Sequence, residues 1–518
     1  MSVRFRIKTL MEKFAAMNTE VQFRLLDLPN ELIAHIIEQV DSVKALRKLS
    51  QTCRRVQELT EPFLYRVALV RSGRRAEAIL RSLETRRARA AAIRRLDVPC
   101  DYHQHQNFEA LSSLLRQARN LKTLMIESPQ CNNGDFEDEP TWRVMAEHIF
   151  SPFHDAVRLA EIGEPSSRPL HNLRELTLHL NGIDSPYWTP SGSSLAIFQI
   201  PTLQYLKISC VNILDDLAKQ LQDKPRTPLK HLELEECNIT HLGLYGILSV
   251  PEALETLYLG ENIYNITAFM GYPVDPASNH LFQTNPKAAL HALQQQQGSL
   301  QSLTYATNER IYQHMQLARQ ILCDPSPVDA GFAGFHCLQH VTLVGQCPNF
   351  ERALMTSKSP PILKTLEHQE ISPLRRTVVN QASPLDSVPF LRAPSCSIPT
   401  TLESVDITYQ SISLMNSRIT EAIKNEFIQP AAVAVETMGV RMRVFNRQVA
   451  GYFPPYLYGE PRPVSEMLFT GYRDGFVGKL SESKPRSDQS SSDGDEESTS
   501  EFEDTEDTED TSSDEDEE

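Results

Sequence analysis

Two patterns of hydrophobic and polar positions divide this chain. Between residues 25 and 66, apolar residues recur at the three-to-four-residue spacing of amphipathic helices. From about residue 93 another frame recurs: an apolar residue, two variable residues, a second apolar residue, one variable residue and a third apolar residue. The first pattern predicts short helices. The second predicts short strands whose side chains alternate between two faces.

The N-terminal pattern predicts three short helices. Residues 27–31 read Asp-Leu-Pro-Asn-Glu and favour a helix start, because proline suits the first helical position and Glu31 faces the positive end of the helix dipole. One apolar stripe follows, formed by Leu32, Ile33, Ile36, Ile37 and Val40. Asp41-Ser42 then caps a second helix. A unit of about 40 residues buries little surface, so it needs a partner or a neighbouring domain.

These residues resemble an F-box of the type common in fungal proteins. The resemblance rests on the run Leu25 to Leu32, on Thr52-Cys53-Arg54 and on the closing residues 62–66. It implies that residues 21–66 dock on the Skp adaptor and so join a cullin-RING ubiquitin ligase. The residues expected to face the adaptor or the small F-box core are Leu28, Pro29, Leu32, Ile36, Leu46 and Leu49. The alternative is a helical bundle that packs only within this chain.

A basic segment follows the F-box. Nine arginines lie between Arg71 and Arg95, against Glu77 and Glu84. Apolar residues at helical spacing predict a linker helix over 67–92 with a solvated basic face. Clustered guanidinium groups suit phosphates, but no aromatic residues are interleaved to stack on bases. Nucleic acid is therefore not the favoured partner.

The strand frame recurs nine times, starting at residues 93, 121, 173, 203, 229, 254, 300, 338 and 402. The copies at 203, 229 and 254 are spaced by 26 and 25 residues, within the ~20–29 residues of a leucine-rich repeat. Cys237 and Asn262 stand where such repeats use a side chain to bond the backbone. We predict an α/β fold in which the F-box precedes an irregular leucine-rich-repeat solenoid over 93–428.

The intervals between the frames vary, and the longer ones predict insertions. These fall at about 128–168, at 262–298 with a helix from Pro286, and at 356–400, a proline-rich stretch that reads as a flexible loop or hinge. Residues 409–427 predict a last helix. The aromatic segment over 429–480 has no assigned element, and it either packs back on the repeats or binds a partner.

The variable positions of the frames predict a binding surface. Side chains between the leucines point to the concave side of the predicted sheet. The expected substrate-binding residues there are Glu175, His179, Tyr205, Lys207, His231, Glu233 and Tyr258. Aromatic and charged anchors suit a protein ligand. The alternative is a solvated face without a ligand.

Charge is concentrated at the C-terminus. The net charge is −16, and residues 488–518 hold 17 acidic and no basic residues, so the rest of the chain carries +1. This composition predicts a disordered acidic tail over 481–518. Ser492, Ser500, Ser512 and Ser513 have an acidic residue three positions on, as acidophilic kinases of the casein kinase type prefer. Residues 1–20 predict a flexible basic leader.

The cysteines and the absence of known motifs limit the compartment and the types of chemistry that the sequence predicts. The nine cysteines form no CxxC pair, which favours reduced thiols in the cytoplasm or nucleus. No apolar run reaches the ~20 residues needed to span a bilayer, so we expect no membrane partner. His336, Cys337, His340 and Cys347 are close in sequence, but two of them fall within one repeat copy. We expect no metal, no cofactor and no catalytic residue, because no phosphate loop, nucleophile elbow or HExxH motif occurs.

Together these observations predict a substrate-recognition subunit of a Skp-cullin-F-box ubiquitin ligase. The F-box would bind the adaptor, and the repeats would hold a protein substrate. The alternative is a protein-binding scaffold that uses the repeats and the acidic tail without promoting ubiquitination. A third interpretation is an RNA-binding protein that uses the arginine-rich segment.

Overall fold

The computed structural model describes residues 25–99, 109–128, 139–163, 168–180, 187–261, 281–307, 331–345, 347–354, 359–370, 399–412, 428–449 and 456–471. The predicted leader, the acidic tail with its four serines, and Asn262 lie outside these residues. None of the helices in the described ranges combines the length and the apolar character needed to cross a bilayer.

The N-terminal unit contains a short 3-10 turn, η1 (Leu25–Asp27), and the helices α2 (Asn30–Glu38), α3 (Val43–Ser50) and α4 (Arg54–Leu64). Its small core consists of Ile33, Ile37 and Leu46. The side chain of Ser42 caps α3 by accepting a bond from the Ala45 amide. Three helices therefore form where the hydrophobic pattern predicts them.

One sheet follows the helices, and its strands pair in chain order. The strands are β1 (Val67–Leu69), β2 (Arg95–Pro99), β3 (Thr123–Glu127), β4 (Glu175–His179), β5 (Tyr205–Ser209), β6 (Asn212–Ile213), β7 (His231–Ile239), β8 (Thr256–Glu261), β9 (Ser302–Ala306), β10 (His340–Val344), β11 (Thr365–Glu370), β12 (Ser404–Ile412), β13 (Arg441–Val449) and β14 (Val464–Phe469). Within the described ranges the pairs are parallel, except that β14 runs antiparallel to β13, and the short β6 pairs only with β7.

Each of the nine predicted frames coincides with a strand that starts two residues after the first apolar residue of the frame. The strand registers align the frames into continuous rows across the sheet. One row of buried side chains runs Leu96, Leu124, Leu176, Leu206, Leu232, Leu257, Leu303, Val341, Leu366, Val405 and Met442. A short frame repeated in register thus builds one shared core.

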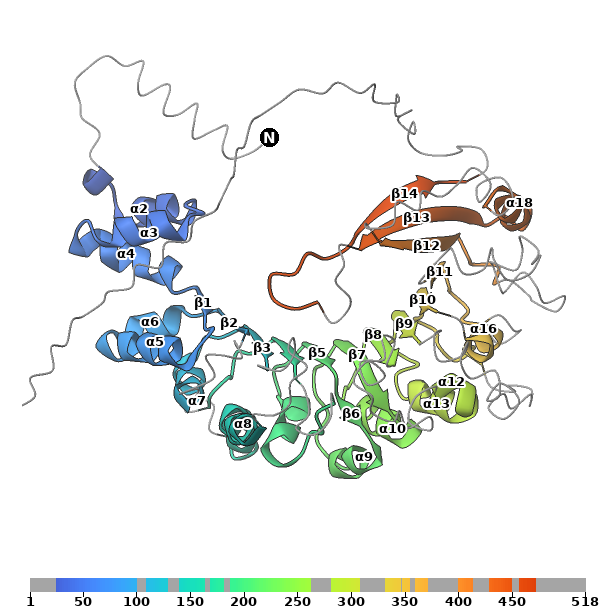
Figure 1. Cartoon of the computed structure of the whole chain (residues 1–518), viewed down its shortest axis with the longest axis horizontal. Helices are drawn as coiled ribbons and strands as arrows, with labels where there is room; N and C mark the ends of the chain where they lie inside the picture. The colour runs from blue at the N-terminus through green and yellow to red at the C-terminus, as the bar shows by residue number, and fades with distance from the viewer. Residues whose placement is uncertain are drawn as a thin grey trace, which may run out of the picture. The chain divides into compact units, whose positions relative to one another are not determined.

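Helices cover the side of the sheet on which these rows lie (Figure 1). They are α5 (Gly73–Thr85), α6 (Arg87–Ala92), α7 (Glu109–Gln117), α8 (Glu139–Glu161), η4 (Gly192–Gln199), α9 (Asp215–Leu221), α10 (His241–Leu248), α12 (Leu281–Thr284), α13 (Pro286–Gln294), α16 (Pro348–Leu354) and α18 (Gln429–Thr437). They pack on one another largely in chain order: α5 on α7, α7 on α8, α9 on α10 and α10 on α13. The opposite face of the sheet is here called the open face.

Three segments differ from the prediction. Residues 67–92 are not one linker helix, because β1 pairs with β2 and starts the sheet before α5 and α6. The proline-rich stretch 356–400 contains β11, and its residues 371–398 lie outside the described ranges. Residues 409–412 belong to strand β12 rather than to a helix, because they pair with β13, while 413–427 also lie outside.

Candidate functional site

Helix α2 is apolar on two faces. Ile33 and Ile37 are buried in the N-terminal core, whereas Leu32 and Ile36 are 51% and 44% exposed. Each pair is spaced by four residues, which places its members on the same helix face. The second face therefore presents apolar side chains that none of the described residues covers, as expected of a docking surface.

The other predicted adaptor residues occupy different positions. Pro29 is exposed at the start of α2, and Leu28 and Leu49 are half-buried against the core. Leu46 is only 6% exposed and packs with Ile33 and Ile37. Leu46 therefore supports the unit from within, and Pro29, Leu32 and Ile36 are the exposed members of the predicted set.

Arg55 holds the segment that leads into α2 by hydrogen bonds. The sequence pattern did not indicate this residue. Its guanidinium donates to the Asn30 Oδ1 atom at 2.9 Å, to the Leu28 carbonyl at 2.8 Å and to the Leu26 carbonyl. One side chain of α4 thus holds the residues that lead into the exposed face of α2. An arginine within a basic stretch gives no sequence pattern that would identify this role.

An ion-pair cluster joins the N-terminal unit to the basic helices. Glu61 of α4 is 7% exposed and accepts bonds from Arg89 at 2.6 Å and Arg86 at 3.3 Å. Arg89 also donates to the carbonyl and the hydroxyl of Ser82 and lies over the ring of Tyr65. Burial raises the pKa of Glu61, but the two arginines outweigh it and hold that pKa below its usual value. We call Glu61, Arg86 and Arg89 the neck cluster.

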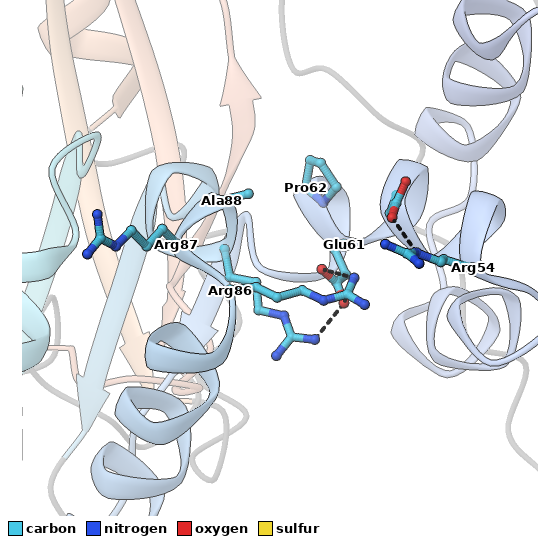
Figure 2. A pocket seen from close by; sticks show the side chains of 8 residues that line it. Arg54, Glu61, Pro62, Arg86, Arg87 and Ala88 are labelled. Atoms are coloured by element: carbon cyan, nitrogen blue, oxygen red, sulfur yellow. Dashed lines mark hydrogen bonds and ion pairs between the residues drawn. The ribbon is translucent and has the colours of Figure 1, made fainter.

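A cavity of about 410 Å³ opens beside the neck cluster, with Arg54, Glu58 and Arg87 also in its lining. Figure 2 shows Glu61 and Arg86 pointing toward each other and Arg87 pointing away from them. Arg54 is paired with Glu58 at 3.1 Å. Four of the nine arginines between Arg71 and Arg95 form ion pairs with described residues, namely Arg81, Arg86, Arg89 and Arg95.

The seven predicted substrate-binding residues lie on the open face in three aligned rows. Glu175, Tyr205 and His231 are register partners in the first row. Lys207, Glu233 and Tyr258 are partners in the middle row. His179 belongs to a third row, the end row, which we define as Glu127, His179, Ser209 and Glu235. The sheet therefore brings all seven residues to one surface.

Two of these residues are less accessible than the alternating pattern predicts. His179 is 3% exposed, and its Nδ1 atom lies 2.6 Å from the Ser209 hydroxyl. Lys207 is 8% exposed and pairs with Glu235 at 2.7 Å and Glu233 at 3.5 Å. Burial, followed by the charges of Lys207 and Arg462, lowers the pKa of His179 to about 3. The end row is therefore covered rather than solvated.

The covering segment comes from the C-terminal part of the chain. Residues 456–462, here called the strap, precede β14, which lies with β13 at the end of the sheet (Figure 1). The amide of Tyr458 donates to the Glu127 Oε1 atom at 2.7 Å, a contact between residues 331 positions apart. The described part of the unassigned segment thus packs back on the strands.

No cluster of three or more His, Cys, Asp or Glu side chains that could hold a metal ion occurs in the described part of the chain. Cys347 is fully buried, and burial raises the pKa of its thiol. Cys237 lies within β7, where its buried sulfur is 3.3 Å from the Glu235 carbonyl oxygen.

Comparison with known families found a match for the N-terminal unit. Residues 25–69 match the F-box-like family. The chain carries an F-box-like domain. The match begins at η1 and ends with β1, so it includes the exposed face of α2 and the start of the sheet. A comparison with curated proteins found no match.

Proposed function

We propose that this chain is the substrate-recognition subunit of a Skp-cullin-F-box type ubiquitin ligase. The observation that carries the proposal is the exposed apolar pair Leu32 and Ile36 within the F-box-like domain. F-box domains imply an adaptor role with the Skp protein as partner. In this proposal Leu32, Ile36 and Pro29 contact the adaptor, Leu28 and Leu49 line the contact, and Leu46 supports it from the core.

The proposal assigns residues 67–471 to a substrate-binding part of the leucine-rich-repeat class, with an irregular solenoid form. Its support is the nine frames in register and the parallel pairing in chain order. In this proposal the open face holds a protein substrate, which Glu175, Tyr205, His231 and Tyr258 contact directly. The acidic tail over 481–518 remains a separate segment of unassigned role.

The mechanism would be proximity. The F-box fixes the chain to the ligase, the open face holds a substrate, and substrate lysines meet the ubiquitin-loaded conjugating enzyme at a high effective concentration. The chain itself forms and breaks no bond, and it needs no cofactor for this role. The proposed location is the cytoplasm or the nucleus, where such ligases act.

The test is co-purification of the full chain with the Skp adaptor and cullin. The variant Leu32→Asp with Ile36→Asp places two charges on the exposed face of α2 and leaves Ile33 and Ile37 in the core. Leu242→Asp is the matched control, because Leu242 is 57% exposed on helix α10. We expect the double variant to lose the adaptor by at least about a hundredfold in affinity, since two apolar anchors of an interface are lost.

The control should bind as well as the unmodified chain does. If the unmodified chain retains neither adaptor nor cullin, the ligase proposal fails and the chain is a scaffold without a ligase. If the double variant binds normally, the adaptor docks elsewhere on the F-box-like domain.

A further inference from the structure

The open face of β2 to β7 is rich in carboxylates. Its three rows hold five acidic and two basic side chains, namely Asp97, Glu127, Glu175, Glu233, Glu235, Arg95 and Lys207. Arg95 is bound to Asp97 at 2.9 Å, and Lys207 is bound to both Glu233 and Glu235. Within the described residues no cation pairs with Glu127 or Glu175. This face therefore favours a ligand that brings positive charge.

The strap brings charges of both signs to the end row: the charge of Glu460 acts on the pKa of Glu127, and the charge of Arg462 acts on that of His179. Arg462 is exposed to solvent and near enough to His179 and Tyr205 for its charge to act on the pKa of both. The Tyr456 hydroxyl lies within electrostatic reach of Glu235. The Tyr458 amide donates a hydrogen bond to Glu127, so the strap contacts the end row on β3. It lies within electrostatic reach of the end row on β4 and β7.

Hydrogen bonds within the strap also hold its backbone in a turn. The Leu457 amide donates to the Glu460 carboxylate at 2.8 Å, and the Glu460 amide donates to the Leu457 carbonyl at 3.1 Å. Gly459 adopts a φ of +85°, which an L side chain rarely adopts. Leu457 is buried in this turn, but Tyr458 is 39% exposed. The strap thus combines a backbone contact, two tyrosines and an arginine, as a bound peptide can, and keeps part of its surface in solvent.

We infer that the end row is a peptide-binding site which the strap occupies in the free chain, and that its external ligand is a basic, aromatic-containing segment of a protein that displaces the strap. This inference rests on the proposed function, because the ligand would be the substrate. The strap then regulates access to the site. A tethered segment acts at an effective concentration of about millimolar, so only a ligand of higher affinity or local concentration displaces it.

The probe is a fluorescein-labelled peptide with the sequence of residues 456–463, added to the full chain and followed by fluorescence anisotropy. In the strap-replaced variant, residues 456–462 are exchanged for a glycine and serine segment of equal length. We expect this variant to bind the probe at least about tenfold more tightly than the unmodified chain, since the competing tethered segment is gone. A probe with glutamate in place of its arginine should bind the variant several-fold less tightly.

A single substitution provides a second test that does not depend on correct folding of the strap-replaced variant. Arg462→Glu changes one exposed residue of the strap and should increase probe binding by the full chain several-fold, whereas Arg74→Glu on α5 should leave it unchanged. Equal probe binding by the unmodified chain, the replaced variant and Arg462→Glu would overturn the inference. So would an absence of binding to all three. Adaptor co-purification is a separate measurement, so failure of the F-box proposal can be told apart from failure here.

Discussion

At the residue scale, Glu127 is a carboxyl group buried by a segment that is remote in sequence. Burial raises its pKa to about 7, and the charges of Glu460 and Asp97 add to this, while the Tyr458 amide acts in the opposite direction. Because the pKa is higher in the folded chain than in the unfolded chain, the protonated form is the one that folding favours. The protonated Glu127 carboxyl group stabilises the folded chain fully below about pH 4.5. This stabilisation is lost as the pH rises through 7.

We predict that Glu127→Gln increases the free energy of unfolding at pH 8 by about 2 kcal/mol and leaves it nearly unchanged at pH 4.5. Glutamine keeps an acceptor for the Tyr458 amide and has no charge to desolvate. Urea unfolding at the two pH values measures the effect. Glu175→Gln is the control, since Glu175 is an exposed carboxylate on the adjacent strand. An equal gain at both pH values would show that the charge of Glu127 is not the cause.

At the element scale, helix α10 depends on two glycines for its close approach to its neighbours. A Cβ atom on Gly246 would lie 2.4 Å from the Cα atom of Ala218 in α9, and one on Gly243 would lie 1.9 Å from the Ile213 carbonyl oxygen. Backbone atoms cannot move aside as a flexible side chain can. The spacing between α9, α10 and β6 is therefore set by residues without a side chain.

Gly246→Ala is expected to lower the free energy of unfolding by about 2 kcal/mol, because overpacking outweighs the gain of about 1 kcal/mol in helix propensity. Gly298→Ala is the matched control, since a Cβ atom there would meet nothing within 4 Å. Chemical denaturation of the two variants side by side gives the comparison. A stable Gly246→Ala variant would mean that α10 can move away from α9.

The elements were predictable wherever their cause is local. The apolar frame located nine strands, because each strand needs two or three apolar residues at fixed spacing whatever lies beside it. Strand β11 was not predicted from the sequence, because His368 takes the third apolar position of the frame and prolines flank the strand. Strand β1 was not predicted either, because it has only three residues and lies next to an arginine-rich run.

The sequence predicted the F-box surface more completely than it predicted the open face of the sheet. The F-box residues lie close together in sequence, so their order and spacing indicated the first surface. The row positions of Lys207 and His179 followed from strand alternation, but their burial did not, because it depends on a strap more than 200 residues away in the chain. Arg55, Glu61 and Arg89 make their contacts across 25 to 29 residues, with no periodic pattern to indicate them.

At the scale of the whole molecule, the F-box-like domain continues directly into the sheet. Helix α4 ends at Leu64, β1 begins at Val67, and the Arg66 carbonyl accepts the amides of Arg94 and Arg95. The neck cluster adds a second connection, from α4 to α6. We expect a direct junction with a buried ion pair to hold the two parts in one orientation, which the proposed ligase role would require for presenting a substrate consistently.

Arg89→Met tests whether the neck cluster sets this orientation. Methionine keeps much of the side-chain volume but leaves Glu61 with only Arg86 and the Gln57 amide as partners, so we expect the local stability to fall by about 2 kcal/mol. Hydrogen exchange of the α4 and α6 amides should then accelerate at least about tenfold, because exchange follows the free energy of local opening. Arg87→Met is the control, since Arg87 is exposed on the same helix and points away from Glu61 (Figure 2).

The same variant separates adaptor binding from substrate presentation. Arg89 lies outside the exposed face of α2, so Arg89→Met should still retain the Skp adaptor. Ubiquitination of a bound substrate should fall, because a loosened neck spreads the substrate lysines over more orientations and lowers their effective concentration at the conjugating enzyme. Unchanged ubiquitination together with faster exchange would show that the neck stabilises the fold without fixing the orientation that the ligase uses.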